Sequence, residues 1–137
     1  MKNNILIILA IIGILSSSYL TYSKYSSDNL CDINDFLSCD KVNTSEYSTF
    51  LNIPLSILSI LYFIIILILT YNNYFNYIFY LSIPVLLFSL YLTYIELFVI
   101  NALCVVCEFT KLIILSLIIS VLIKKKNQFI NFLVIFD

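Results

Sequence analysis

The sequence predicts an all-α membrane protein: a four-transmembrane-helix bundle with an extracytoplasmic loop that contains cysteines and a short surface helix. Hydrophobic residues make up 62% of the chain and charged residues only 11%, which is far from the composition of a soluble domain. Four apolar runs follow one another, and each approaches the length of about 20 residues that crosses a bilayer. At 137 residues, the whole chain, 1–137, is expected to form a single domain.

The first apolar run covers residues 5–22 and follows the basic residue Lys2. It is almost unbroken, so we expect a transmembrane helix here. A cleaved signal peptide is the alternative, because a short basic start and the serines at 16–18 also fit such a segment. The run is long for the apolar core of a signal peptide, which favours the span.

Residues 24–50 form the one sizeable polar stretch, with four Asp and one Glu against two Lys. Such a stretch must lie outside the bilayer. Within it, Ile33, Phe36 and Leu37 follow Asp32 at helical spacing, and Asp is a good N-cap residue. We therefore predict a short amphipathic helix here that rests on the membrane surface.

The other three spans are expected over residues 53–71, 77–100 and 104–123. The second opens with Ile53-Pro54, and Pro is well tolerated in the first turn of a helix. The lysine run at 124–126 is expected to end the fourth helix. The tail that follows is too short for another span.

Four spans place both termini on one side, and the positive-inside rule assigns Lys2 and the lysine run to the cytoplasm. The acidic loop and the start of the fourth span then both face outward. All four cysteines therefore meet at one membrane surface, and they are Cys31, Cys39, Cys104 and Cys107. Disulfides persist on that side of a membrane, whether it faces a periplasm, the extracellular space or a lumen.

The composition excludes several classes of function and leaves the cysteines as the candidate catalytic residues. The net charge of −1 offers no basic surface to a nucleic acid. The chain contains no His, which excludes imidazole catalysis, haem ligation by His and zinc sites that use His. Cysteine is the obvious catalytic residue that is left.

Cys104 and Cys107 are three residues apart at the start of a helix, so they share one face and can close a small, readily reducible disulfide. The helix N-terminus also favours a thiolate at Cys104. Cys31 and Cys39 are eight residues apart in the loop, and one can pair with the other or reach Cys104. Two dithiols on one side suggest an electron relay, with buried packing cysteines or a four-thiolate zinc site as the alternatives.

Several short motifs stand in a specific order between about residue 31 and residue 110. They are Cys31-Asp32, Cys39, Ser45, Ile53-Pro54-Leu55-Ser56, the stretch 94–99 and Cys104-Val105-Val106-Cys107. This order resembles the vitamin K epoxide reductase family. In the unrelated bacterial thiol oxidases that use quinones, the close cysteine pair precedes the wide pair, whereas here it follows.

The resemblance implies a thiol-disulfide oxidoreductase coupled to the reduction of a quinone of the ubiquinone or menaquinone type. It implies that Cys31 exchanges with a thioredoxin-like extracytoplasmic thiol oxidase on a separate chain, that Cys39 relays electrons to Cys104, and that Cys107 faces the quinone. Ser45 matches a family position near the quinone.

The composition looks bacterial, so we expect the bacterial cytoplasmic (inner) membrane, with the active site on the periplasmic face. Reduction of vitamin K epoxide is the alternative within the family. A non-catalytic membrane protein, stapled by disulfides or binding zinc, is the alternative of another class.

Two positions depart from the family pattern. Leu55 stands where the family often has Asn, and Lys111 stands where the vertebrate enzymes have Tyr. Lys111 shares a helical face with Cys107 and is a candidate to bind the quinone and to stabilise a thiolate or a quinol anion, unless it pairs with Glu108. Glu96 would be costly against lipid, so we expect it inside the bundle, for example against Lys111, as a candidate proton donor.

Overall fold

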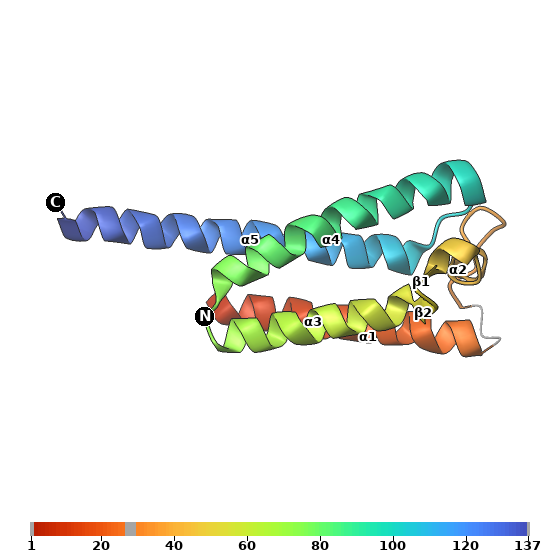
Figure 1. The fold of residues 1–137 in the computed structure, drawn as a ribbon, viewed down its shortest axis with the longest axis horizontal. Helices are drawn as coiled ribbons and strands as arrows, with labels where there is room; N and C mark the ends of the chain where they lie inside the picture. Colours follow the sequence, from red (N-terminus) through yellow and green to blue (C-terminus); the bar gives the residue numbers. More distant parts are fainter. Residues whose placement is uncertain (1, 27–29, 137) are drawn as a thin grey trace.

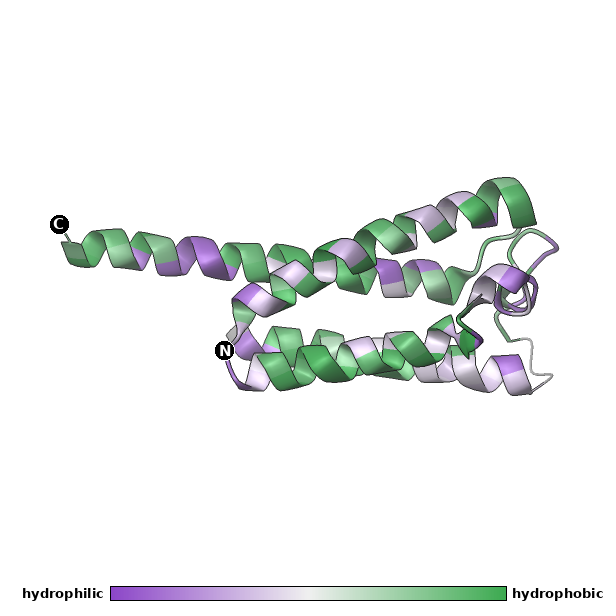
Figure 2. Ribbon diagram, in the orientation of Figure 1, coloured by the Kyte–Doolittle hydropathy of each residue, from purple (hydrophilic) through white to green (hydrophobic). Residues whose placement is uncertain are grey.

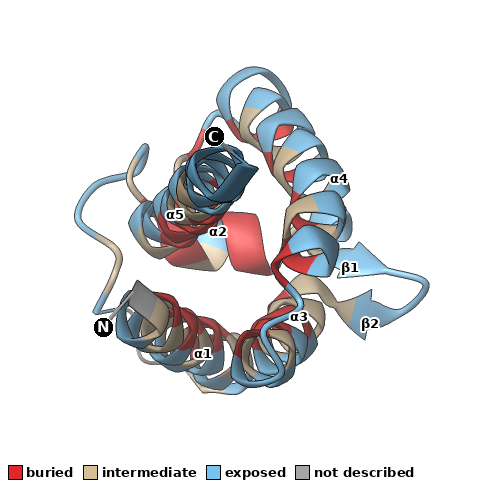
Figure 3. Cartoon of the chain, turned by 90° about the vertical axis from the view of Figure 1, so that its left-hand side faces the viewer, coloured by how far each residue is buried: buried red, intermediate tan, exposed pale blue. Residues whose placement is uncertain are grey.

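The computed structural model describes residues 2–26 and 30–136, and the protein is mostly helical (81%). Four long helices run along one axis (Figure 1), and they are α1 (Lys2–Tyr25), α3 (Leu55–Tyr71), α4 (Phe75–Ile95) and α5 (Val105–Phe136). Seen from the end, they form a ring with α2 (Cys39–Asn43) lying across its far end (Figure 3). The predicted all-α class is confirmed. Asp28 of the predicted loop lies outside the described residues.

The helices are those of an integral membrane protein. By length and composition, three can cross a membrane: Asn3–Tyr25, Phe75–Ile100 and Val105–Phe136. The second of these combines α4 with a π-helical turn, η2 (Glu96–Ile100). α3 is a shorter apolar helix of 17 residues. Hydrophobic residues dominate all four helices (Figure 2), while the fourth span stays a prediction.

The prediction that the lysine run ends the last helix is wrong, because α5 continues to Phe136. Lysine is a good helix former, and neither Gly nor Pro follows it within α5. The run instead marks the place where α5 leaves the bundle (Figure 1). There Lys124 Nζ donates to Asn3 Oδ1 and lies 3.5 Å from the centroid of the Phe75 ring.

The second predicted span begins with a strand pair rather than a helix. β1 (Thr49–Phe50) and β2 (Ile53–Pro54) pair antiparallel, and the turn residues Leu51 and Asn52 have φ values of 52° and 66°. Positive φ at both central residues is typical of a type I′ hairpin. Pro54 is therefore the N-cap of α3, which starts at the next residue, and does not lie in its first turn.

The short surface helix also lies elsewhere than predicted. Residues 31–38 are not helical, and the helix of this region is α2. Its N-cap is Ser38, whose hydroxyl accepts from the Lys41 N–H and donates to Asp32 Oδ1. Asp32 Oδ1 also accepts from the Asp40 N–H at 3.2 Å. The predicted capping role of Asp32 thus belongs to a helix that starts seven residues further on.

The core of the bundle is apolar and draws on all four long helices. Fully or almost fully buried side chains include Leu6, Ala10, Phe63, Ile66, Ile78, Ile113, Leu117 and Val121. α1 and α3 approach closely at Gly13, where a Cβ atom would lie 2.5 Å from the Phe63 ring. This packing places the C-terminal end of α4 and the N-terminal end of α5 beside α2 (Figure 1).

Candidate redox site

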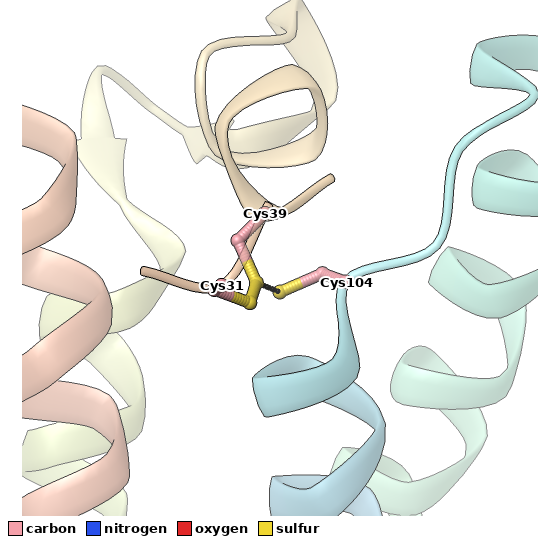
Figure 4. A group of neighbouring side chains, drawn as sticks. All are labelled: Cys31, Cys39 and Cys104. Carbon is pink, nitrogen blue, oxygen red and sulfur yellow. Dashed lines mark hydrogen bonds between the residues drawn. A yellow bond between two sulfur atoms is a disulfide. The ribbon is translucent and has the colours of Figure 1, made fainter. Parts of the chain in front are cut away.

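Three of the four cysteines meet where the loop touches the start of α5 (Figure 4). Cys31 and Cys39 form a disulfide with a Cα–Cα distance of 5.6 Å. The Cys104 thiol points at this disulfide, and its Sγ lies 3.2 Å from Cys39 Sγ. Cys39 and Cys104 are both buried, while Cys31 is partly exposed. The sequence left open how the loop cysteines pair, and this arrangement decides it.

Backbone contacts hold the loop in this position. Leu37 forms a parallel bridge with Leu103, and the Leu103 N–H donates to Phe36 O at 2.6 Å. Leu103 directly precedes Cys104, and Leu37 is two residues before Cys39. The bridge therefore aligns the chain just before each of the two sulfur atoms that face each other.

The connection between α4 and α5 turns sharply before it reaches Cys104. Asn101 has a left-handed conformation with a φ of 54°, and the Ala102 N–H donates to Glu96 O. Asn is one of the few residues that adopt this conformation readily, and it commonly ends a helix. The turn places Cys104 directly before the first turn of α5.

Cys104 Sγ lies at the N-terminus of α5, as predicted, and accepts a hydrogen bond from the Cys107 N–H at 3.3 Å. Unpaired N–H groups at a helix start stabilise negative charge on sulfur. The Cys107 side chain is partly buried, is not disulfide-bonded and lies on the cavity side of the helix. Cys104 therefore faces the loop disulfide, whereas Cys107 faces the cavity.

A cavity of about 460 Å³ lies beside Cys107. Residues of α3, α4 and α5 line it, together with residues of the loop region between 42 and 50. Its wall is largely apolar, and its volume falls in the range of sites for small molecules. Polar or reactive residues in the wall include Ser45, Ser56, Glu96, Cys107 and Lys111. Both residues that the sequence predicts as quinone ligands, Ser45 and Lys111, therefore line the same cavity as Cys107.

Ser45 and Ser56 differ in how their hydroxyls are used. Ser45 Oγ donates to Val42 O at 2.7 Å, so it already has a partner. Ser56 Oγ is buried and has no hydrogen-bond partner among the described residues. Ser56 belongs to the Ile53-Pro54-Leu55-Ser56 motif, but the sequence assigns its hydroxyl no role, because the lack of a partner depends on the packing around α3.

A cluster of Thr93, Glu96, Glu108 and Lys111, called the polar cluster here, connects α4, η2 and α5. Lys111 Nζ donates to Glu108 Oε1 at 2.6 Å, to Thr93 Oγ1 at 2.6 Å and to Glu96 Oε1 at 3.2 Å. Both pairings considered for Lys111, with Glu108 and with Glu96, are therefore present. Thr93 is missed by the sequence analysis, although it lies one helical turn before Glu96.

Among the described residues, the sulfur atoms of the three cysteines that meet at the loop form the one group that resembles a metal site. The Sγ atoms of Cys31, Cys39 and Cys104 lie within 4.8 Å of one another, and Cys107 is not part of the group. Structural zinc sites are usually four-coordinate. Since two of the three sulfur atoms form a disulfide, this arrangement suits thiol-disulfide exchange better than metal binding.

Residues 4–122 match the model of the vitamin K epoxide reductase family, which covers most of the chain. A search of curated proteins finds no match.

Proposed function

Because the chain belongs to the vitamin K epoxide reductase family, a family of oxidoreductases, we propose that it is a quinone-dependent thiol oxidase of the membrane. In this role it re-oxidises a separate thioredoxin-like protein that forms disulfides outside the cytoplasm. The single observation that carries the proposal is the contact of Cys104 Sγ with Cys39 Sγ at 3.2 Å, with Cys107 on the cavity side of the same helix turn.

Electrons enter at Cys31, the more exposed end of the loop disulfide. A thiolate of the partner attacks the Cys31 sulfur, the Cys31–Cys39 bond breaks, and the partner leaves as a disulfide when its second thiol resolves the mixed disulfide. The loop then carries two thiols.

The next transfer joins the loop to α5. The Cys39 thiolate attacks Cys104 in a Cys104–Cys107 disulfide and releases the Cys107 thiolate. Cys31 then attacks Cys39, which restores the loop disulfide and releases Cys104. The observed arrangement, with the loop oxidised and Cys104 and Cys107 as free thiols, corresponds to the state after this transfer.

The residues of the cavity fit a quinone. The wall is apolar enough for the ring and the prenyl chain, and Lys111 supplies a cation near Cys107. The buried Ser56 hydroxyl, which lacks a partner among the described residues, would be satisfied by a carbonyl oxygen of the ring. Leu55 also lines the cavity and offers no hydrogen bond. Ser56 would therefore donate to a ring oxygen, while Ser45 and Lys111, whose donors are already used, would contact the ring from the cavity wall.

When bound, a quinone supplies an acceptor for two electrons and two protons. Cys104 and Cys107 provide both electrons as their disulfide forms. The proposal includes four spans, with α3 as the second, and the redox site on the periplasmic face of a bacterial inner membrane. The lysine run, near the N-terminus of α1, would lie at the cytoplasmic face.

Purified protein with a water-soluble quinone and a reduced thioredoxin-like protein tests the proposal. We expect quinol to form with the wild type and to be lost in Cys31→Ser and in Cys107→Ser, because each variant interrupts one end of the relay. Ser116→Ala, an exposed position of α5 away from the cysteines, is the control and should retain the activity. Quinol formation that survives both cysteine substitutions would contradict the relay.

The partner is identified by trapping. In Cys39→Ala the Cys31 thiol stays free and can attack the disulfide of an oxidised partner, whose second sulfur leaves as a thiolate. The loop then holds no second thiol that could resolve this mixed disulfide, so the partner stays attached to Cys31. Non-reducing electrophoresis and mass spectrometry of the adduct are expected to identify a thioredoxin-like extracytoplasmic protein. Recovery of no adduct from cells in which the wild type is active would exclude Cys31 as the entry point.

A further inference from the structure

The polar cluster contains two carboxyl groups and one ammonium, and two of its members, Glu96 and Lys111, line the apolar cavity. The side chains of Lys111 and Glu96 are 12% and 5% exposed, and that of Glu108 is 35% exposed. If both carboxyls were ionised, the cluster would carry an uncompensated negative charge in surroundings where such a charge is costly. One carboxyl that keeps its proton makes the cluster neutral.

The contacts indicate which carboxyl is neutral. Glu108 makes the shorter contact with Lys111, 2.6 Å against 3.2 Å for Glu96, and it is the more exposed of the two. A short contact of this kind is typical of a charged pair. The other oxygen of Glu96, Oε2, accepts from the Cys104 N–H at 3.5 Å, which is long for a bond to a carboxylate.

We propose that Glu96 is held as a neutral carboxylic acid in the cavity wall and supplies a proton to the quinone when Cys104 and Cys107 reduce it. This inference rests on the proposed function for the transfer step. Glu96 lines the cavity together with Cys107 and contacts the backbone of Cys104, so it touches both the electron donors and the acceptor site. Lys111 and Glu108 remain an ion pair throughout.

The step balances with the groups that are present. Cys104 and Cys107 lose two electrons and two protons as the S–S bond forms, and the quinol gains two of each. Glu96 gives one proton to a quinone oxygen, and a proton released by the thiols restores its O–H. The other thiol proton goes to the second quinone oxygen. The titratable groups that face Glu96 are Glu108, Lys111, Cys104 and Cys107, which lie on α5 or directly before it. Cys39 of α2 lies beyond Cys104 and is disulfide-bonded, so it does not titrate.

Infrared spectroscopy of the protein without quinone tests the protonation state. A protonated carboxyl has a carbonyl stretch that a carboxylate lacks, so we expect one such band from a buried carboxyl at neutral pH. The band should disappear in Glu96→Gln and persist in Glu46→Gln, a control in the exposed turn before β1. A spectrum in which Glu96→Gln leaves the band unchanged, or in which the wild type has no band, overturns the inference.

Stability and kinetics separate a chemical role from a structural one. Gln resembles a neutral Glu in shape and charge, so Glu96→Gln should unfold at the wild-type temperature. Quinol formation should slow by about 100-fold or more, the usual contribution of a general acid, while reduction of the loop disulfide by a dithiol stays unchanged. Equal losses in both half-reactions, together with a lower unfolding temperature, would assign Glu96 a structural role only.

The two proposals fail in different ways. If the wild type forms no quinol with any dithiol, the proposed function is wrong, and the infrared band still reports on Glu96 by itself. If the wild type forms quinol and Glu96→Gln does so at the same rate and with the same dependence on pH, the inference about Glu96 is wrong and the relay stands.

Discussion

Replacing Gly13 by Ala tests the close approach of α1 and α3. Gly13 is the one glycine of the chain, and an added Cβ would lie 2.5 to 2.6 Å from three atoms of the Phe63 ring. Phe63 is completely buried, so its ring cannot move into open space. The two helices must separate or the ring must leave its preferred position.

The size of the effect follows from two opposing contributions. Ala favours a helix over Gly by about 1 kcal/mol. Forcing one extra carbon into a filled core usually costs about 1 to 3 kcal/mol, and the backbone of α1 makes the upper part of this range more appropriate here. We therefore expect a net loss of about 1 to 2 kcal/mol, or about 2 to 8 °C in the unfolding midpoint for a protein of this size.

The assay is thermal unfolding in a mild detergent, followed by circular dichroism. The double variant Gly13→Ala with Phe63→Leu provides the control, because the smaller side chain leaves room for the added methyl group. The loss caused by Gly13→Ala should be smaller in the Phe63→Leu background than in the wild type. If Gly13→Ala alone unfolds at or above the wild-type temperature, the close contact between α1 and α3 is refuted.

Three further substitutions or deletions probe single features. Tyr62→Phe removes the buried 2.7 Å hydrogen bond to Ser82 and should cost about 1 to 3 kcal/mol in thermal unfolding, part of which Ser82→Ala restores. Asn101→Val forces a β-branched residue into a left-handed conformation, so we expect the free energy of unfolding to fall by about 1 to 3 kcal/mol. Thiol-disulfide exchange between the loop and Cys104 should also slow in stopped-flow measurements. Asn101→Gly should retain the wild-type stability and the wild-type exchange rate. Deletion of residues 128–137 should leave the unfolding midpoint unchanged, because residues 128–136 are exposed; a large decrease would show that this segment stabilises the bundle.

Patterns of composition and local spacing predicted much of the fold. Long apolar runs determine where helices can cross a bilayer, so the four long helices were recognisable within a few residues of their starts. Their ends were less predictable: the lysine run looked like the end of a helix, yet lysine continues a helix as readily as it ends one. The pairing of Lys111 with Glu108 was also predictable, because residues three apart on a helix are neighbours.

The loop was the part that local patterns described least well. Its hydrophobic spacing predicted a helix after Asp32, but the segment instead pairs with the connection before α5 through the Leu37 to Leu103 bridge. A backbone contact between residues 66 positions apart has no signature in the spacing of either segment. The helix therefore starts only at Cys39, once the bridge has ended.

The sequence by itself determined that this is a helical membrane protein with two cysteine pairs, because composition and spacing act through local interactions with lipid and along single helices. Only the tertiary structure decided that Cys31 pairs with Cys39, that Cys104 faces Cys39, and that Cys107 lines a cavity with Lys111. Two cysteines that are eight residues apart in a loop can pair with each other or with Cys104. The packing of α2 and the loop against the start of α5 selects one of these pairings.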